Sequence, residues 1–388
     1  MIRLQSLLVY TLLAIIMYFF AKKASLMQKA SYQMIPVIAF ILVFGLRYSV
    51  GIDWENYREI YEEELFGMTF KEMLETRYEI GFLSIVYLCY IFQLPTYMLF
   101  VCLAAIQIIF LYLALKEDHG VLPYVYLAFI FSGIAIFGFC NVMRQNIAFC
   151  IFLYALKFVR DRKFIHYVLF YALAFCFHKS VIILLPCYFI WSIKSAIFNR
   201  PITQISIFIA SIIMSLSNPI QHIFEYLESI IILMGFEGYI DSVEDLTTNS
   251  YIGPTRITLI LAYLIIFYHS QDIKQFFSSK LFNQFYDLFF IGACCYFIFL
   301  GNMMFGRITQ YFTNFSFIIF GYALYYYFQQ PKTRTTLIGI AAISLSLFTS
   351  YSNLIVKCDK NTDGYVSYFQ KDLHRQKDMQ RTIMLNNR

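Results

Sequence analysis

The sequence contains few charged residues. Only 14% of its 388 residues are Asp, Glu, Lys or Arg, whereas 60% are hydrophobic. A soluble domain averages about 25% charged and about 45–50% apolar residues. This shortage of charge excludes an ordinary soluble globular protein and predicts a chain that resides in a membrane.

Several motifs that carry chemistry in other enzymes are also absent. The sequence contains no P-loop, no GxGxxG and no HExxH. Its nine cysteines form no CxxC pair, and His, Asp and Glu are not clustered at metal-ligand spacing. We therefore expect no nucleotide cofactor, no metal site and no disulfide framework. The net charge of +6 does not indicate a nucleic-acid partner, because the basic residues lie in short loops between apolar runs.

Long apolar runs recur from one end of the chain to the other. Each run is near the length that crosses ~30 Å of hydrocarbon as a helix. The runs lack the ~10-residue alternating pattern of a membrane β-barrel. We predict an all-α, polytopic membrane protein of about 11–13 helical segments, at about 20 residues per crossing. The first run, Leu4–Phe20, has no small-residue cleavage site and is interpreted as a retained span.

The predicted organisation is a single transmembrane domain over residues 1–356, with outer loops 47–78 and 218–253 and a polar tail at 357–388. The first loop contains eight acidic and four basic residues, and the second contains six acidic residues and no Lys or Arg. Cytoplasmic loops are enriched in Lys and Arg, so both loops are assigned to the outer side. The number of crossings places the tail outside, whereas its seven basic and four acidic residues favour the cytoplasmic side.

One part of this topology is inconsistent. Loop 47–78 and Arg144 should lie on the same side of the membrane, which requires an even number of crossings between them. The apolar runs Ile80–Leu94, Tyr97–Leu115 and Val121–Phe139 suggest three. We therefore expect either that one segment is re-entrant or that the true boundaries differ.

The chain is organised around the stretch from Gly45 to Glu64, which follows an apolar run. Arg47 and Asp53 in this stretch are candidates for a polar site at the mouth of a span. Two structural alternatives stay open: Arg47 as an anchor at the membrane interface, and Asp53 as the N-cap of the following helix.

A second polar cluster opens a predicted helix over residues 141–158. On that helix Asn141 and Gln145 would share a face, with Arg144 beside them. Ionisable groups at membrane depth cost ~2.5–3.5 kcal/mol on insertion scales and are functional candidates. Because Arg can bind phosphate oxygens bidentately, Arg144 and Gln145 are predicted to contact an anionic substrate.

Two further positions are candidates for the same site. His178 lies between the predicted half-spans Tyr167–Phe177 and Val181–Trp191, and it is either a general base or a structural residue. Arg307, with Tyr311 one turn away, is either a substrate contact or an anchor at the end of a span. Three outer-side arginines without a nucleotide motif indicate an anionic, lipid-linked substrate.

These motifs resemble those of the EpsG family of bacterial, Wzy-like polysaccharide polymerases. The segment RYSVGIDWENY resembles the family's R-Y-x-x-G-x-D-x-x-x-Y opening, and NVMRQNIAF with the later FCFHKS resembles its central element. GRITQYF resembles a later R-x-x-x-Y-F element, so the likeness covers about residues 30–330 in order and spacing. The chain departs from the pattern at Lys179 and Val181, and neither change removes a polar site residue.

The resemblance implies a GT-C-like polymerase at the outer face of the bacterial inner membrane. Donor and acceptor would be glycans on undecaprenyl diphosphate, and the product would be O-antigen, capsule or exopolysaccharide. No metal, cofactor or nucleotide sugar is implied, whereas membrane lipid, a chain-length regulator and a flippase are implied partners. Asp53 or His178 would be the general base. The diphosphate and the rest of the substrate would be bound by Arg47, Arg144, Gln145, Arg307 and Tyr311.

Three other classes of protein are weighed against this interpretation. A flippase for the same lipid-linked units would favour internal repeats and polar residues along a central path, and the sequence shows neither. A membrane-bound O-acetyltransferase would need a histidine deep in the membrane and an entry for its coenzyme on the cytoplasmic side. His178 is instead predicted on the outer side. A structural or partner-binding membrane protein stays open as an alternative if the match to the motifs is accidental.

Overall fold

The computed structural model describes residues 2–190, 200–216, 252–277, 280–300, 303–358 and 364–370. Within these ranges every regular element is helical, and the only extended pairing is one isolated bridge between Arg47 and Ser367. Four described helices are long and apolar enough to cross a membrane, or five if a sharply bent pair forms one span. The predicted class, an all-α polytopic membrane protein, is confirmed.

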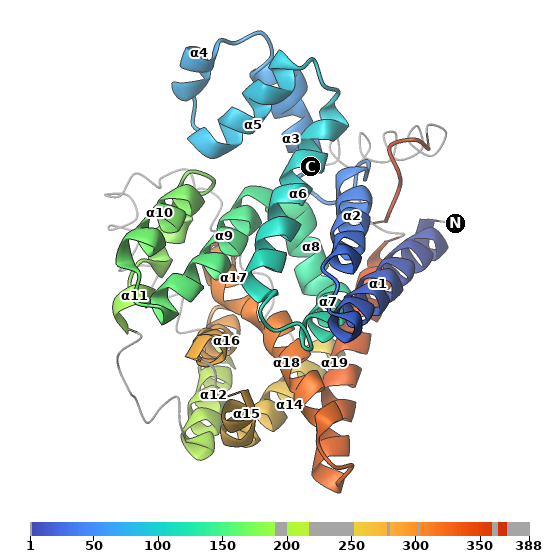
Figure 1. Ribbon diagram of the computed structural model, residues 1–388, viewed down its shortest axis with the longest axis vertical. Coiled ribbons are helices and arrows are strands. Elements are labelled where there is room, and N and C mark those ends of the chain that lie inside the picture. The colour runs from blue at the N-terminus through green and yellow to red at the C-terminus, as the bar shows by residue number, and fades with distance from the viewer. Residues whose placement is uncertain are drawn as a thin grey trace. The chain divides into compact units, whose positions relative to one another are not determined.

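The helices form two compact units, one of residues 1–186 and 347–388 and the other of residues 187–346. In the first unit α1 packs against α2 and α7, α2 against α6, α6 against α9, and α9 against α10 (Figure 1). The helices of this unit before the α9 segment are α1 (Ile2–Met27), α2 (Ser31–Gly45), α3 (Trp54–Glu59), the π-helix η1 (Ile60–Glu64), α4 (Phe70–Leu74), α5 (Ile80–Ile91), α6 (Thr96–Leu115), α7 (Leu122–Phe131) and α8 (Gly133–Asn141).

The remaining helices of the first unit carry much of the candidate site. They are α9 (Met143–Arg160), α10 (Phe164–Phe175) and the short 3₁₀ helix η2 (Lys179–Leu184). The last helix, α19 (Arg334–Lys357), belongs to this unit from Leu347 onward. Helix α9 is buried on all sides from Gln145 to Leu153, so it forms the centre of the unit's apolar core.

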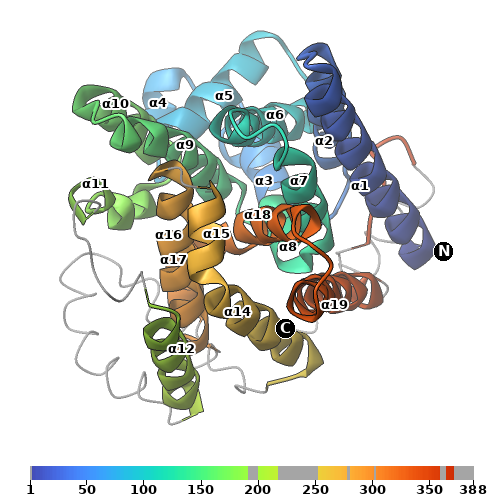
Figure 2. The same ribbon diagram turned by 60° about the horizontal axis from the view of Figure 1, so that its bottom comes forward.

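The second unit is built around α16, which packs against α12, α17 and α18 (Figure 2). Aromatic rings fill its core: Phe208 of α12, Tyr263 of α14 and Phe289 of α16 are buried and in edge or tilted contact. Its helices are α11 (Cys187–Ile190), α12 (Pro201–Leu216), α14 (Pro254–Tyr268), α15 (Ser270–Phe277), α16 (Lys280–Ile298), α17 (Met303–Thr313) and α18 (Phe315–Gln329). Of the predicted outer loop 218–253, residues 218–251 lie outside the described residues.

The apolar segments between residues 78 and 144 differ in length and shape. Helix α5 has 12 residues, so it is ~18 Å long, shorter than ~30 Å of hydrocarbon. Helices α7 and α8 are bent by 81° at their junction, as in a broken span or a re-entrant loop. Only α6 is by itself long and apolar enough to cross a membrane, so the number of crossings in this region stays a prediction.

Direct contacts place loop 47–78 and the start of α9 at the same end of the first unit. The main-chain N–H of Asp53 donates a hydrogen bond of 3.3 Å to the Asn141 side-chain oxygen. Gly51 approaches the same oxygen so closely that a Cβ would overlap it, and its φ of +93° also favours glycine. The loop and the α8–α9 junction are thus held together.

The described part of the tail, residues 364–370, lies beside the Gly45–Glu64 stretch. The Tyr48 N–H donates to the Val366 carbonyl, and the Tyr368 N–H donates to the Leu46 carbonyl, both at 2.8 Å. Because these are main-chain contacts within one unit, the tail begins at the same end as Arg47. The side of the membrane on which the tail lies stays a prediction, and residues 371–388 lie outside the described residues.

Candidate functional site

Arg144 lies in the first turn of α9, directly after a break in the chain. Helix α8 ends at Asn141, Val142 leaves the helical conformation with φ −78° and ψ 61°, and α9 begins at Met143. The prediction of one continuous helix from residue 141 is therefore wrong, and Asn141 does not share a helix face with Gln145. The first turn of a helix carries unpaired N–H groups and the positive end of the helix dipole, which favours anions.

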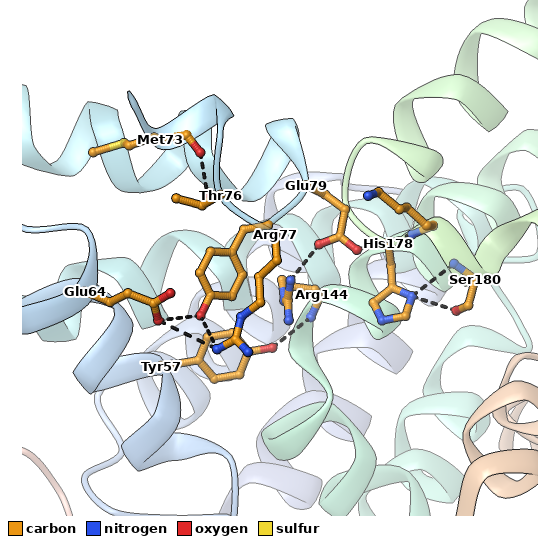
Figure 3. A network of polar contacts seen from close by, with 11 residues as sticks. Tyr57, Glu64, Met73, Thr76, Arg77, Glu79, Arg144, His178 and Ser180 are labelled. Carbon is orange, nitrogen blue, oxygen red and sulfur yellow. Dashed lines mark hydrogen bonds and ion pairs between the residues drawn. The ribbon is translucent and has the colours of Figure 1, made fainter. Parts of the chain in front are cut away.

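The guanidinium of Arg144 is held by the carboxylate of Glu79 (Figure 3) and by two aromatic faces. Its Nη1 lies 2.6 Å from Glu79 Oε2, and its guanidinium carbon lies 5.3 Å from the ring centres of both Tyr78 and Phe82. Its main-chain N–H donates to the Tyr57 hydroxyl at 3.4 Å. The Arg144 side chain is 21% exposed, so the cation is fixed in direction and still accessible.

Glu79 connects Arg144 to the segment that carries His178. Its second oxygen, Oε1, accepts a hydrogen bond of 3.4 Å from the main-chain N–H of Lys179. The neighbouring Gly81 donates its N–H to the Cys176 carbonyl at 2.7 Å. A Cβ added at residue 81 would also lie 2.7 Å from that oxygen, which is too close for an ordinary contact. The sequence analysis missed Glu79, whose only signal is a carboxylate directly before an apolar run.

His178 has a defined hydrogen-bonding arrangement. Its Nδ1 accepts the main-chain N–H of Ser180 at 3.3 Å and lies 2.6 Å from the Ser180 hydroxyl (Figure 3). An N–H group can only donate, so Nδ1 of the neutral imidazole is the acceptor and Nε2 carries the proton. A neutral His178 therefore presents an N–H donor on the side of the ring away from Ser180.

The turn after His178 is shorter than the predicted half-spans. Helix α10 ends at Phe175, residues 179–184 form the 3₁₀ helix η2, and α11 covers only Cys187–Ile190. The predicted helix over Val181–Trp191 is therefore interrupted over its described residues, and Trp191 lies outside them. The break itself, which the FHKS segment predicted, is present.

A second network fixes the ring of Tyr78 beneath Arg144. The Tyr78 hydroxyl donates to Glu64 Oε2 at 2.6 Å and accepts from Arg77 Nη2 at 2.9 Å. Burial and the hydrogen bond to the Glu64 carboxylate raise the pKa of Tyr78 above its usual value. The phenol therefore stays protonated near neutral pH, and its ring face remains available to the cation.

Asp53 occupies the N-cap position of α3, but its side chain makes no capping hydrogen bond. The carboxylate is half-buried and lies near Tyr57, whose pKa is raised mainly by burial and in smaller part by the Asp53 charge. The capping explanation therefore accounts for the position of Asp53 but not for its side chain. Through Tyr57, Asp53 belongs to the same neighbourhood as Arg144.

Arg47 is 1% exposed and bonded to the main chain. Its guanidinium donates to the carbonyls of Phe44, Val50 and Cys140, with the last bond at 2.8 Å. Its guanidinium carbon lies 5.2 Å from the Phe100 ring centre. This environment is that of a structural residue that joins the end of α2 to α8; substrate binding by Arg47 stays a prediction.

The other predicted substrate contacts are Gln145, Arg307 and Tyr311. Gln145 is 3% exposed on α9. Arg307 is exposed and Tyr311 is buried, both on α17 of the second unit. Their convergence with Arg144 therefore stays a prediction. In the part of the chain that the structure describes, no group of three or more His, Cys, Asp or Glu side chains could hold a metal ion.

Removal of the Glu79 carboxylate is expected to release Arg144. Glu79→Ala deletes both the 2.6 Å ion pair and the bond to Lys179, and we expect about a tenfold loss of the polysaccharide synthesis that the sequence resemblance implies, as the cation loses its orientation. Glu79→Gln keeps the hydrogen-bonding shape and should lose less. Polymer yield in strains with equal membrane abundance is the measurement, and equal yields from both variants and the wild type would contradict the role.

The fold and this cluster define a polytopic, all-α membrane protein with an accessible arginine, a histidine and carboxylates at one end of a compact unit. The model of the EpsG family matches residues 30–369, and the chain belongs to the EpsG family. This membership supports a role like that of a polysaccharide polymerase and implies lipid-linked glycan substrates. Searches of curated proteins and of solved structures find no match to the chain.

Proposed function

We propose that this protein joins oligosaccharide repeat units carried on undecaprenyl diphosphate at the outer face of the bacterial inner membrane. A hydroxyl of the acceptor glycan attacks the anomeric carbon of the donor glycan. The new glycosidic bond forms as the bond from that carbon to the diphosphate breaks, the hydroxyl proton passes to a base, and undecaprenyl diphosphate leaves. The reaction requires no nucleotide sugar and no metal ion.

The observation that carries the proposal is the position of Arg144. A cation at the N-terminal turn of α9, fixed by Glu79 and open on one side, suits the diphosphate of a lipid carrier. As the donor bond breaks, negative charge develops on the diphosphate. A preoriented guanidinium stabilises that charge more than it stabilises the bound substrate, which is the condition for catalysis.

The hydrogen bonds of His178 support different roles for the two base candidates. Its Nδ1 lone pair is engaged by Ser180, so His178 would offer its Nε2 proton to a phosphate oxygen. Asp53, a half-buried carboxylate near Tyr57, is then the preferred general base for the acceptor hydroxyl. A carboxylate accepts that proton as the new bond forms.

The test is reconstitution of the full chain in lipid vesicles with lipid-linked repeat units from the producing strain. We expect a ladder of lengthening glycans on gels and release of undecaprenyl diphosphate detected by mass spectrometry. Unchanged single units that have crossed the bilayer would instead indicate a flippase. Unchanged chain length with a newly attached acyl group would indicate an acetyltransferase.

A further inference from the structure

Four aromatic side chains from three distant segments meet beside the Gly45–Glu64 stretch. They are Tyr48, Tyr97, Tyr368 and Phe369, which we call the aromatic platform. The ring of Tyr368 lies 4.7 Å from that of Tyr97 and 5.9 Å from that of Tyr48, centre to centre. Phe369 lies 6.2 Å from Tyr97. No sequence motif predicts this surface, because its residues come from three segments that are far apart in the sequence.

The tail segment that completes the platform is held firmly in place. Its main chain bonds to residues on both sides of Arg47, as described above. The Gln370 side-chain oxygen accepts a hydrogen bond of 2.6 Å from the Gln5 amide and one of 3.0 Å from the Ser367 N–H. The rings of Tyr368 and Phe369 are therefore presented by an ordered segment.

The platform remains open to a ligand and carries a carboxylate at its edge. Phe369 is 67% exposed, and the three tyrosines are partly exposed. Glu62, in the π-helix η1, accepts a hydrogen bond from the Thr96 hydroxyl. Burial and, next, the Glu62 charge raise the pKa of Tyr368, so the carboxylate and the phenol are neighbours. π-helical turns are rare and occur often at functional sites.

This combination of groups matches the chemistry of a sugar ring. A pyranose presents a C–H face, which packs on an aromatic ring, and hydroxyls at its rim, which donate to a carboxylate. Glu62 also pairs with Arg58 at 2.8 Å, so this edge offers a hydrogen-bonding carboxylate without the unpaired positive charge that a phosphate group or the anionic surface of a bilayer would require.

A continuous series of ring contacts links the platform to Arg144. Tyr48 lies 4.7 Å from Trp54, which stacks on Phe100 at 5.4 Å. Phe100 lies 6.3 Å from Tyr57, whose hydroxyl accepts the Arg144 N–H. The platform and the anion-binding cluster therefore lie on the same end of one unit.

We propose that the aromatic platform binds sugar residues of the lipid-linked glycan while the Arg144 cluster holds its diphosphate. The assignment rests on the proposed function for the nature of the glycan. It adds a role for the tail: residues 364–370 form part of the glycan site. Loss of the platform should weaken glycan binding and shorten the product, whereas loss of Arg144 should stop the reaction.

The test uses Trp54 as a fluorescent reporter, because the chain has only two tryptophans. Trp191→Phe in the full chain leaves Trp54, 4.7 Å from Tyr48, as the sole signal. The purified protein in detergent is titrated with the free oligosaccharide repeat unit, cleaved from its lipid by mild acid. We expect Phe369→Ala and Tyr97→Ala each to weaken binding about tenfold, the loss expected for a specific aromatic contact. Phe92→Ala is the matched control, because Phe92 is 68% exposed at the end of α5.

The outcomes separate the platform from its rivals and from the proposed function. Equal affinities in Phe369→Ala, Tyr97→Ala and the parent would overturn the platform, as would an equal loss in Phe92→Ala. Unchanged affinity with reduced membrane abundance would identify the rings as an interfacial aromatic belt. Weaker binding in the platform variants supports the site even if the wild type fails to lengthen lipid-linked units, a failure that would count against the polymerase alone.

Discussion

Arg144→Ala is expected to stop chain growth and leave single repeat units on the lipid carrier. The variant removes the accessible guanidinium at the start of α9, so charge that develops on the leaving diphosphate is no longer neutralised. Removal of one preoriented donor to such charge typically lowers the rate by about 10²–10³-fold. Arg144→Lys keeps the charge but loses bidentate geometry, and we expect intermediate activity. Glycan length in cells and initial rates in vesicles are the measurements.

Arg160→Ala provides a matched control on the same helix. Arg160 lies at the opposite end of α9 and pairs with Glu117 and Asp161 at 2.7 Å, near the surface. Surface pairs contribute ~0–1 kcal/mol, so this variant should make polymer of normal length. Long polymers in Arg144→Ala strains with confirmed membrane abundance would sink the proposed site, as would an equal defect in Arg160→Ala.

Arg47→Ala is expected to destabilise the protein instead of slowing chemistry alone. The variant leaves the buried carbonyls of Phe44, Val50 and Cys140 without their donor. Each buried acceptor left unsatisfied costs ~1–3 kcal/mol. We expect a fall in the apparent melting temperature in detergent and loss of the monodisperse fraction. The junction of α2, α8 and the tail should loosen first.

The same experiment decides between the two roles of Arg47. If the arginine binds diphosphate, Arg47→Ala would melt like the wild type and yet fail to polymerise. If it holds the fold, the stability and the activity of Arg47→Ala fall together. The platform variant Phe369→Ala serves for comparison and should keep its stability, because Phe369 is 67% exposed. Thermal melting of both variants beside the wild type distinguishes these results.

The positions of the ionisable residues were predictable only in part. Arg144 and His178 stand out in the sequence because charges are rare within apolar runs. Glu79 does not stand out, since a carboxylate at the edge of a span is ordinary. Its partnership with Arg144 is a direct contact between residues 65 positions apart in the chain. Sequence spacing carries no information about such a contact.

Local backbone breaks were equally hidden. The apolar pattern is interrupted at Asn141, which the sequence analysis took as the start of a helix, whereas the structure makes Asn141 the end of α8 and begins α9 at Met143. The short length of α5 and the 81° bend between α7 and α8 also lie within apolar runs. Hydropathy reports which residues avoid water, but it does not report how far a helix extends within the membrane.

The sequence by itself determined the class of this protein: an all-α membrane protein, with motifs in the order of the EpsG family. These features follow from composition and local order, which are written directly in the chain. Only the tertiary structure decided that Arg47 is buried against carbonyls, that Glu79 holds Arg144, and that the tail joins the Gly45–Glu64 stretch. Those facts depend on contacts between distant segments, and such contacts are set by packing of the whole unit.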